Sequence, residues 1–258
     1  MDPSRLLACL NADFARLRSV VPDRLSARVP TCPDWTVGDL TRHVGDVYLH
    51  KTLAMREGVE REPWPPAELA DEDPLKLLDR GHAGLMEEFA AHGPEDHAGS
   101  WYTPDPTVGF WIRRMAQETV IHRIDAELGA GVPVAPVAED LAVDGIDEVL
   151  RVFAEFSVAE WGDYFTGILD RSPGRLHTLR TDGAEWRVRT APGLFAVEGG
   201  TDGPGGRAEC DVTVSAPPAD LLRWLWNRES PGVPSDVRVA GTPEAVAELR
   251  GCLTVATE

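Results

Sequence analysis

The chain has few positive charges and almost no lysine. Only two of its 25 basic residues are lysines, Lys51 and Lys76, against 43 acidic residues, and the formal net charge is −18. Such a charge repels phosphate backbones and anionic lipid surfaces, so roles in nucleic-acid binding and at membrane surfaces are disfavoured. We therefore expect small-molecule partners. Asparagine is also rare, and this arginine-rich, lysine-poor composition is typical of a GC-rich genome such as those of the actinobacteria.

Cysteine and long apolar runs are scarce as well. The four cysteines are widely spaced and form no CxxC pair, which predicts neither a disulfide framework nor a thiolate zinc cluster. No apolar run approaches the roughly 20 residues that a membrane-spanning helix needs. The start, MDPSRLLACLNADF, has neither the basic nor the apolar region of a signal peptide. We expect a cytoplasmic protein with reduced cysteines.

The length of 258 residues suits two domains rather than one. Apolar residues at helical spacing predict helices over residues 3–21, 37–58, 74–92 and 108–128. Thr36 is the expected N-cap of the second helix, with Asp39 at its third position, and Gly129 is the expected C-terminal cap of the fourth. A fifth helical stretch, AEDLAVDGIDEVLRVFAEFSVAEWGDY, completes a helical bundle that we expect to span residues 1–164.

The pattern changes at about residue 165. Short alternating segments, LHTLRT, EWRVRTA, LFAVEGG and CDVTVSA, are separated by glycine-rich turns and predict strands. Two further segments, PADLLRWLWNR and TPEAVAELRG, predict helices. The expected fold class is therefore α+β, with a helical bundle followed by a smaller α+β domain over residues 165–258.

The most informative pattern is a glutamate and a histidine four residues apart, Glu118 and His122 in QETVIHRID, together with His43 in WTVGDLTRH. An i, i+4 pair projects both side chains from one helical face. A third ligand from another helix completes a two-histidine, one-carboxylate metal site that leaves a coordination position open for chemistry. His43 lies on or beside the apolar stripe of its helix, so we expect it to point toward the bundle interior.

Other interpretations of these residues stay open. A histidine on an apolar face is more often a hydrogen-bonded core residue than a ligand. Glu118 and His122 also fit an ordinary ion pair on a solvated helix face. Asp46, His50 and Asp125 continue the same helical faces and are expected to replace or orient a ligand, with solvation as the alternative for His50.

Two segments, CPDWTVGDLTRHVGD and ETVIHRIDAELG, together resemble the mycothiol-dependent maleylpyruvate isomerase-like family, whose first domain is a DinB-like four-helix bundle. The resemblance implies that His43, Glu118 and His122 bind a divalent metal, usually zinc. The later segments CDVTVSAPPADLLRWLWNRES and VRVAGTPEAVAEL resemble the sterol-carrier-protein-like C-terminal domain often fused to these bundles. There Asn227 stands where glycine is common in the family, and Arg228 is retained.

The resemblance implies an enzyme that uses mycothiol, the low-molecular-weight thiol of actinobacteria, as cofactor or cosubstrate. Coordination to zinc converts a thiol to a thiolate, which adds to an electrophilic carbon or displaces a leaving group. We therefore expect an isomerase or S-transferase acting on a small electrophilic metabolite. Arg228 is the candidate to bind an anionic substrate or cofactor group across the domain interface. The alternatives are a metal-activated-water hydrolase and a non-catalytic ligand-binding protein with a structural metal.

Overall fold

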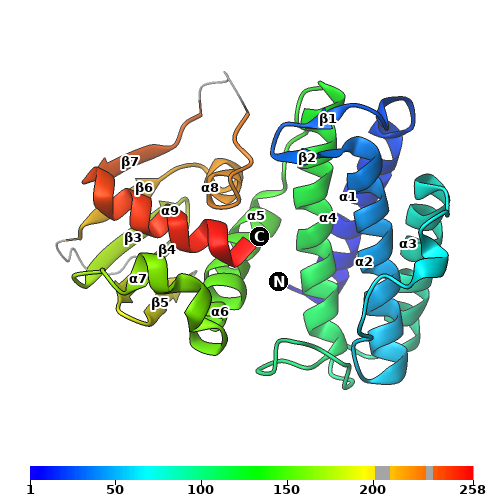
Figure 1. Ribbon diagram of the computed structural model, residues 1–258, viewed down its shortest axis with the longest axis horizontal. Helices are drawn as coiled ribbons and strands as arrows, with labels where there is room; N and C mark the ends of the chain where they lie inside the picture. The colour runs from blue at the N-terminus through cyan, green and yellow to red at the C-terminus, as the bar shows by residue number, and fades with distance from the viewer. Residues whose placement is uncertain (201–209, 231–234, 258) are drawn as a thin grey trace. The chain divides into compact units, whose positions relative to one another are not determined.

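The structure, a computed structural model, describes residues 1–200, 210–230 and 235–257. The chain divides into two compact units, Met1–Ala135 and Pro136–Glu258. Within the described residues, the first unit is a bundle of four α-helices and the second contains a five-stranded sheet with its own helices (Figure 1). This confirms the predicted α+β class, with the helical bundle first.

The bundle consists of α1 (Pro3–Val20), α2 (Val37–Glu57), α3 (Pro74–Ala91) and α4 (Val108–Ala130). Each helix begins at a polar N-cap whose side chain accepts a backbone hydrogen bond from the first turn, and these caps are Asp2, Thr36, Asp73 and Thr107. The prediction of a C-terminal cap at Gly129 is wrong. The fourth helix continues through Gly129 to Ala130, and Gly131 ends it in the left-handed region at φ 68°.

Helix α4 is buried over most of its length. It packs against α1 and α2, and buried residues line all of its sides. Helix α2 packs closely on α3, because a Cβ at Gly81 would lie only 2.7 Å from the carbonyl oxygen of Gly45. Only glycine permits this approach. The position of α2 between α3 and α4 is therefore well defined, and α2 carries His43.

A short antiparallel hairpin precedes α2. It pairs β1 (Arg28–Val29) with β2 (Cys32–Thr36), and β1 also packs against α4. The sequence pattern did not predict this hairpin, because its two prolines are depleted in strands. The connections also include two 3-10 turns, η1 (Pro22–Arg24) and η2 (Ala67–Leu69).

The second unit is built on β3 (Arg175–Thr181), β4 (Ala184–Ala191), β5 (Leu194–Gly200), β6 (Val212–Ser215) and β7 (Arg238–Gly241). Among the described residues the strand order is β5-β4-β3-β6-β7, and only the β3–β6 pair is parallel. The unit also contains α8 (Pro218–Leu225) and α9 (Pro243–Thr257), and the hydroxyl of Thr190 in β4 donates a 2.6 Å hydrogen bond to Glu248 of α9. Strands β3 to β6 match the predicted segments.

The boundary between the units lies at Ala135 rather than at residue 164, where we expected it. The fifth helical stretch forms α5 (Glu139–Glu148), a π-helical segment η3 (Val149–Glu155) and α6 (Phe156–Glu160), followed by η4 (Gly162–Phe165) and α7 (Thr166–Leu169). Helix α5 packs against α8, and η3 packs against α9 and β5. The second unit therefore buries this stretch, and its continuous helical periodicity gave no sign of that.

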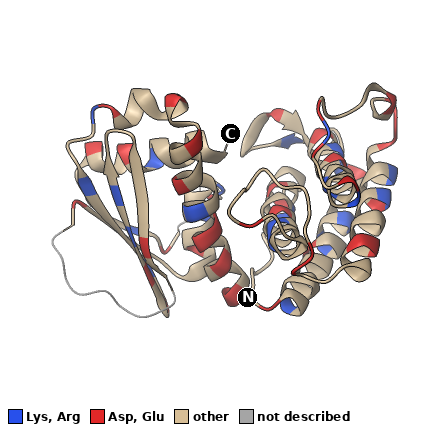
Figure 2. Cartoon of the chain, turned by 90° about the horizontal axis from the view of Figure 1, so that it is seen from below, with Lys and Arg blue, Asp and Glu red and all other residues tan. Residues whose placement is uncertain are grey.

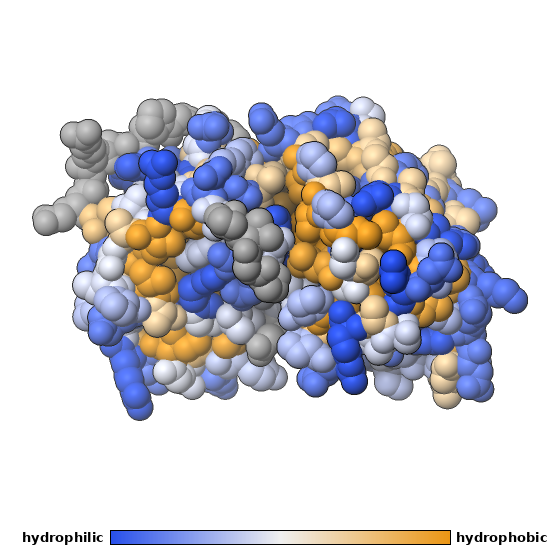
Figure 3. All heavy atoms as spheres, turned by 90° about the horizontal axis from the view of Figure 1, so that it is seen from above, coloured by the Kyte–Doolittle hydropathy of each residue, from blue (hydrophilic) through white to orange (hydrophobic). Residues whose placement is uncertain are grey.

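Charged residues are spread over both units. Figure 2 shows acidic and basic residues along the helices and on the sheet, and on the face drawn in Figure 3 hydrophilic side chains surround the apolar ones. Arg18 of α1 and Asp79 of α3, for example, are joined by a 2.7 Å ion pair. None of the helices in the described part of the chain is long and apolar enough to cross a membrane.

The packing of α1 on α3 includes a stacked histidine that generates a pH prediction. His82 stacks on Phe14, with ring centroids 3.6 Å apart and an interplanar angle of 7°. Its Nε2 atom is buried and lacks a hydrogen-bond partner among the described residues. Burial disfavours the charged ring more than the nearby Asp79 favours it, and the pKa of His82 falls to about 4.

The stability contribution of His82 should be complete above the ordinary histidine pKa of about 6.5 and should be lost as the pH falls toward 4, because the unfolded chain then binds more protons. In a His82→Phe variant, the free energy of unfolding should therefore fall less between pH 7 and pH 5 than in the wild type. Denaturant titrations at the two pH values measure this, with His92→Phe, an exposed site, as the control. An equal loss in His82→Phe would refute the assignment.

Candidate metal centre

Helix α2 brings His43 to the site. A capping box starts the helix, in which the Asp39 N–H donates to the Thr36 hydroxyl at 3.1 Å and the Thr36 N–H donates to the Asp39 carboxylate at 2.8 Å. His43 lies about two turns further along. The end of β2 places Trp35 beside it, with ring centroids 4.8 Å from His43 and 6.4 Å from His122. Trp35 thus forms an apolar wall next to both histidines.

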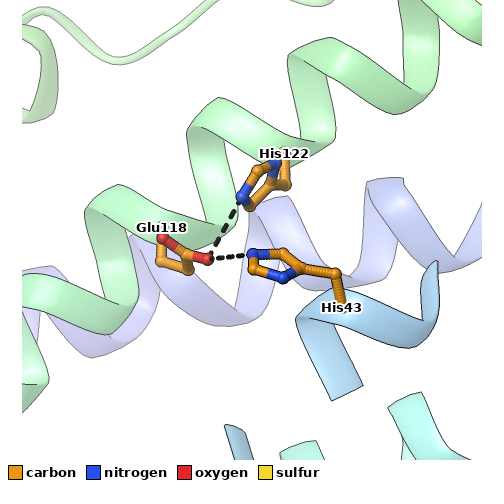
Figure 4. Close-up of side chains that lie close together, drawn as sticks. All are labelled: His43, Glu118 and His122. Atoms are coloured by element: carbon orange, nitrogen blue, oxygen red, sulfur yellow. Dashed lines mark ion pairs between the residues drawn. The ribbon is translucent and has the colours of Figure 1, made fainter. Parts of the chain in front are cut away.

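Helix α4 supplies the other two groups from one face, one turn apart. Glu118 Oε1 lies 3.1 Å from His122 Nε2 and 3.3 Å from His43 Nε2. The ligand atoms of the three side chains all lie within 4.8 Å of one another, and they converge from two different helices (Figure 4). The structure therefore brings together all three residues that the spacing singled out as metal ligands.

The cluster is most exposed at His43. The side chains of Glu118 and His122 are 14% and 10% exposed, whereas that of His43 is 37% exposed. Two imidazole nitrogens and one carboxylate oxygen are a donor set that zinc enzymes use, with a further coordination position left for substrate or water. The exposed edge at His43 is the side from which a small molecule can reach such a position.

The two less exposed residues of the cluster, His122 and Glu118, each contact a further polar side chain. His122 Nδ1 lies 3.0 Å from the Asp125 carboxylate, which also accepts a 2.5 Å hydrogen bond from the Thr31 hydroxyl. This contact directs the other ring nitrogen, Nε2, toward Glu118. On the opposite side, Arg114 Nη2 donates to Glu118 Oε2 at 2.7 Å. Asp125 thus takes the orienting role expected from its spacing.

The charges of the cluster shift two pKa values. Burial opposes ionisation of Glu118. The pKa of this carboxyl nevertheless lies well below its usual range, because of the charge of His122, hydrogen bonds from both histidines and the charge of Arg114. Burial also opposes the charged form of His122, but Glu118 and Asp125 raise its pKa to about 9. The site thus favours an ionised carboxylate and a cation beside it. A divalent metal held by the same atoms would replace the His122 proton.

Two other residues of the predicted α2 face do not join the converging group. His50 stacks on Trp64, with ring centroids 4.6 Å apart, and its Nε2 lies 3.1 Å from the carbonyl oxygen of Arg61. The alternative expectation that His50 is solvated is wrong, because the residue is only 8% exposed. Asp46 is half-buried, and this burial raises its pKa.

Arg228 lies just beyond α8 in the second unit. Its Nη1 donates to the carbonyl oxygen of Trp226 at 2.7 Å, and its backbone N–H donates to the carbonyl oxygen of Arg223 at 2.7 Å. The preceding Asn227 has φ 55°, a left-handed conformation that glycine adopts freely. This explains why glycine is common at that position in the resembled family.

Arg114 and Trp35 were not among the candidate site residues. Arg114 stands four residues before Glu118, so its spacing alone would have placed it on the same face. No local signal singles out Trp35, because its contact with the histidines depends on the hairpin.

Comparison with known families finds matches over most of the chain. The family model described as the mycothiol maleylpyruvate isomerase N-terminal domain matches residues 7–127, and the one described as the MDMPI C-terminal domain matches residues 140–248. The gap between the two matches contains the boundary of the two units. No curated protein matches the chain.

Solved structures with the same fold carry the same family name. A crystal structure of the mycothiol-dependent maleylpyruvate isomerase has 14% sequence identity and a TM-score of 0.62, and the match covers 95% of this chain and 96% of that chain. A histidine-to-alanine mutant of that enzyme has 13% identity, the same TM-score and the same coverage. At such low identity these matches establish a shared fold.

Proposed function

The chain belongs to the mycothiol maleylpyruvate isomerase family, and from this premise we propose that it is a metal-dependent enzyme that uses mycothiol. It either isomerises a small electrophilic metabolite or, as an S-transferase, joins mycothiol to that metabolite through its sulfur atom. Family membership supports an isomerase that uses this thiol. Metal dependence and the choice between isomerisation and S-transfer are our proposal. The geometry of His43, Glu118 and His122 is the observation that carries it.

The three side chains fit a divalent metal. In a tetrahedral zinc site with bonds of about 2.0–2.1 Å, neighbouring ligand atoms lie about 3.3–3.4 Å apart. Glu118 Oε1 lies 3.3 Å from His43 Nε2 and 3.1 Å from His122 Nε2. The ligand atoms of all three residues lie within 4.8 Å of one another, so the two imidazole rings need only approach each other to share a metal with Glu118. We propose that these residues hold one divalent metal, with zinc as the first candidate.

The reaction needs a thiolate at neutral pH. A free thiol has a pKa of about 8.5 and is mostly protonated at pH 7. When bound, a divalent metal supplies the positive charge that stabilises a thiolate. A thiolate that adds to an activated double bond permits rotation about the resulting single bond, and its expulsion then gives the isomer. If it displaces a leaving group instead, the product is a thioether.

The protein's own residues orient and shield the reactants. Asp125 fixes the ring of His122, and its contact at Nδ1 leaves Nε2 for the metal. Trp35 packs beside both histidines and keeps water from that side. The exposed edge at His43 leaves a route for the thiol and the electrophile. The arrangement thus supports a site that small molecules can reach beside His43.

We predict that one divalent metal binds per chain and that His43→Ala, Glu118→Ala and His122→Ala each weaken its binding by more than about 100-fold, since loss of an orienting group alone costs about 10–100-fold. Elemental analysis of the purified variants, with a chelator competition for affinity, measures this. His92→Ala, which changes an exposed histidine just after α3, should keep full metal content. Full occupancy in Glu118→Ala would remove that carboxylate from the ligand set.

We predict that mycothiol binds only to the metal-loaded protein and that its binding releases a proton near neutral pH, because the thiol must ionise to become a ligand. Calorimetry in two buffers of different ionisation enthalpy counts the proton. Turnover with water alone, without metal-dependent thiol binding, would favour the hydrolase alternative. Metal that stabilises the fold while neither binding nor turnover occurs would favour the ligand-binding alternative.

We further propose that Arg228 binds an anionic group of the substrate, because a guanidinium makes paired contacts with a carboxylate. Its Nη1 contact with the Trp226 carbonyl supports a fixed orientation. With maleylpyruvate as the first substrate tested, Arg228→Lys should raise KM by about 10-fold or more and leave the metal content unchanged. Arg238→Ala, at an exposed arginine of β7, is the control. An unchanged KM in Arg228→Lys would rule out this role.

A further inference from the structure

The two carboxylate oxygens of Glu118 face different partners. Oε1 faces the Nε2 atoms of both histidines, at 3.1 Å from His122 and 3.3 Å from His43. Oε2 accepts a 2.7 Å hydrogen bond from Arg114 Nη2. One oxygen is thus directed at the candidate metal position, and the other is held by a guanidinium.

The Arg114 side chain is itself held in place. It comes from α4 one turn before Glu118, and only 4% of it is exposed. A buried guanidinium is costly unless its charge is paired, and Arg–carboxylate hydrogen bonds are short and directional. Rotation of the Glu118 carboxylate would break the bond to this buried charge. The orientation of the carboxylate is therefore strongly constrained.

We propose that Arg114 is a positioning residue that restricts Glu118 to a single-oxygen metal ligand and so keeps one coordination position open for the thiol. The inference rests on the metal role proposed above for His43, Glu118 and His122. Carboxylates bind metals through one oxygen or through both. Binding through both would fill the position that a thiol needs, and the bond from Arg114 to Oε2 opposes it.

This role differs from that of a group that tightens metal binding. The positive guanidinium repels a divalent cation, so its removal is not expected to release the metal. What its removal should change is the number of oxygen atoms that Glu118 gives to the metal. The coordination number and the thiol affinity are therefore the diagnostic quantities, and both can be measured without turnover.

The test uses the full chain loaded with Co²⁺, whose visible absorption is stronger in four-coordinate than in five- or six-coordinate sites. Arg114→Leu should still bind one Co²⁺ per chain, but with weaker visible absorption and with an affinity for mycothiol reduced by about 10–100-fold. Arg114→Lys keeps the charge and offers a single point donor, so it should restore part of both properties.

Arg123→Leu is the matched control. Arg123 is also a buried arginine of α4, and it pairs with Asp13 and Glu127 rather than with the cluster. Its loss removes a buried ion pair from the same helix, so the cost to folding is of the same kind. The Co²⁺ spectrum and the mycothiol affinity of folded Arg123→Leu should match those of the wild type.

An unchanged Co²⁺ spectrum and an unchanged mycothiol affinity in folded Arg114→Leu would overturn the inference. So would loss of Co²⁺ from the folded variant, because Arg114 would then govern affinity. If the leucine variant does not fold, a crystal structure of the metal-loaded wild type decides, since a two-oxygen Glu118 ligand contradicts the inference and a one-oxygen ligand supports it. A wild type that takes up no metal would instead refute the proposed function itself.

Discussion

A single ionised carboxylate between two helices constrains the N-terminal unit. Glu118 is mostly buried, and a buried charge is tolerated only when groups of opposite charge or good hydrogen-bond donors surround it. Arg114 and His122 supply two such partners from the same helix, and His43 supplies the third from α2. The two helices must therefore keep a fixed register. The capping box at Thr36 and the close packing of α2 on α3 serve this requirement.

Helix α4 contains a second buried ion-pair cluster that shows what a purely structural one looks like. Arg123 pairs with Asp13 and Glu127, and Glu127 also accepts from Arg16. Its central pair, Arg123 and Glu127, is almost fully buried, and none of its members is an imidazole. The Glu118 cluster differs in both respects, because two of its members are imidazoles that can exchange a proton for a metal and one edge is open to solvent. That difference favours a functional role for the Glu118 cluster.

Local sequence patterns predicted the parts of the structure that local physics determines. The spacing of Glu118 and His122 places both on one helical face, and Thr36 caps α2 as its position before the apolar stripe suggested. The first three bundle helices lie within about a residue of their predicted bounds. The end of α4 was misplaced because Gly129 and Gly131 are both plausible caps, and only the packed helix distinguishes them.

What the sequence could not give depends on tertiary contacts. Trp35 contacts both histidines only because the folded hairpin places it beside them. The helical stretch that ends near Tyr164 has the same periodicity whichever unit buries it, so the boundary was placed too late. The β1–β2 hairpin escaped prediction because its pairing overrides the local preference of its prolines.

The backbone at position 227 accommodates asparagine in place of the glycine that is common in the family. Asparagine tolerates the left-handed region better than most residues with a side chain. Here its amide also donates to the Thr254 hydroxyl and accepts from Arg250. These bonds to α9 offset the conformational cost that glycine avoids. The backbone can therefore follow the path that glycine would permit, so the substitution at Asn227 is no argument against a functional Arg228.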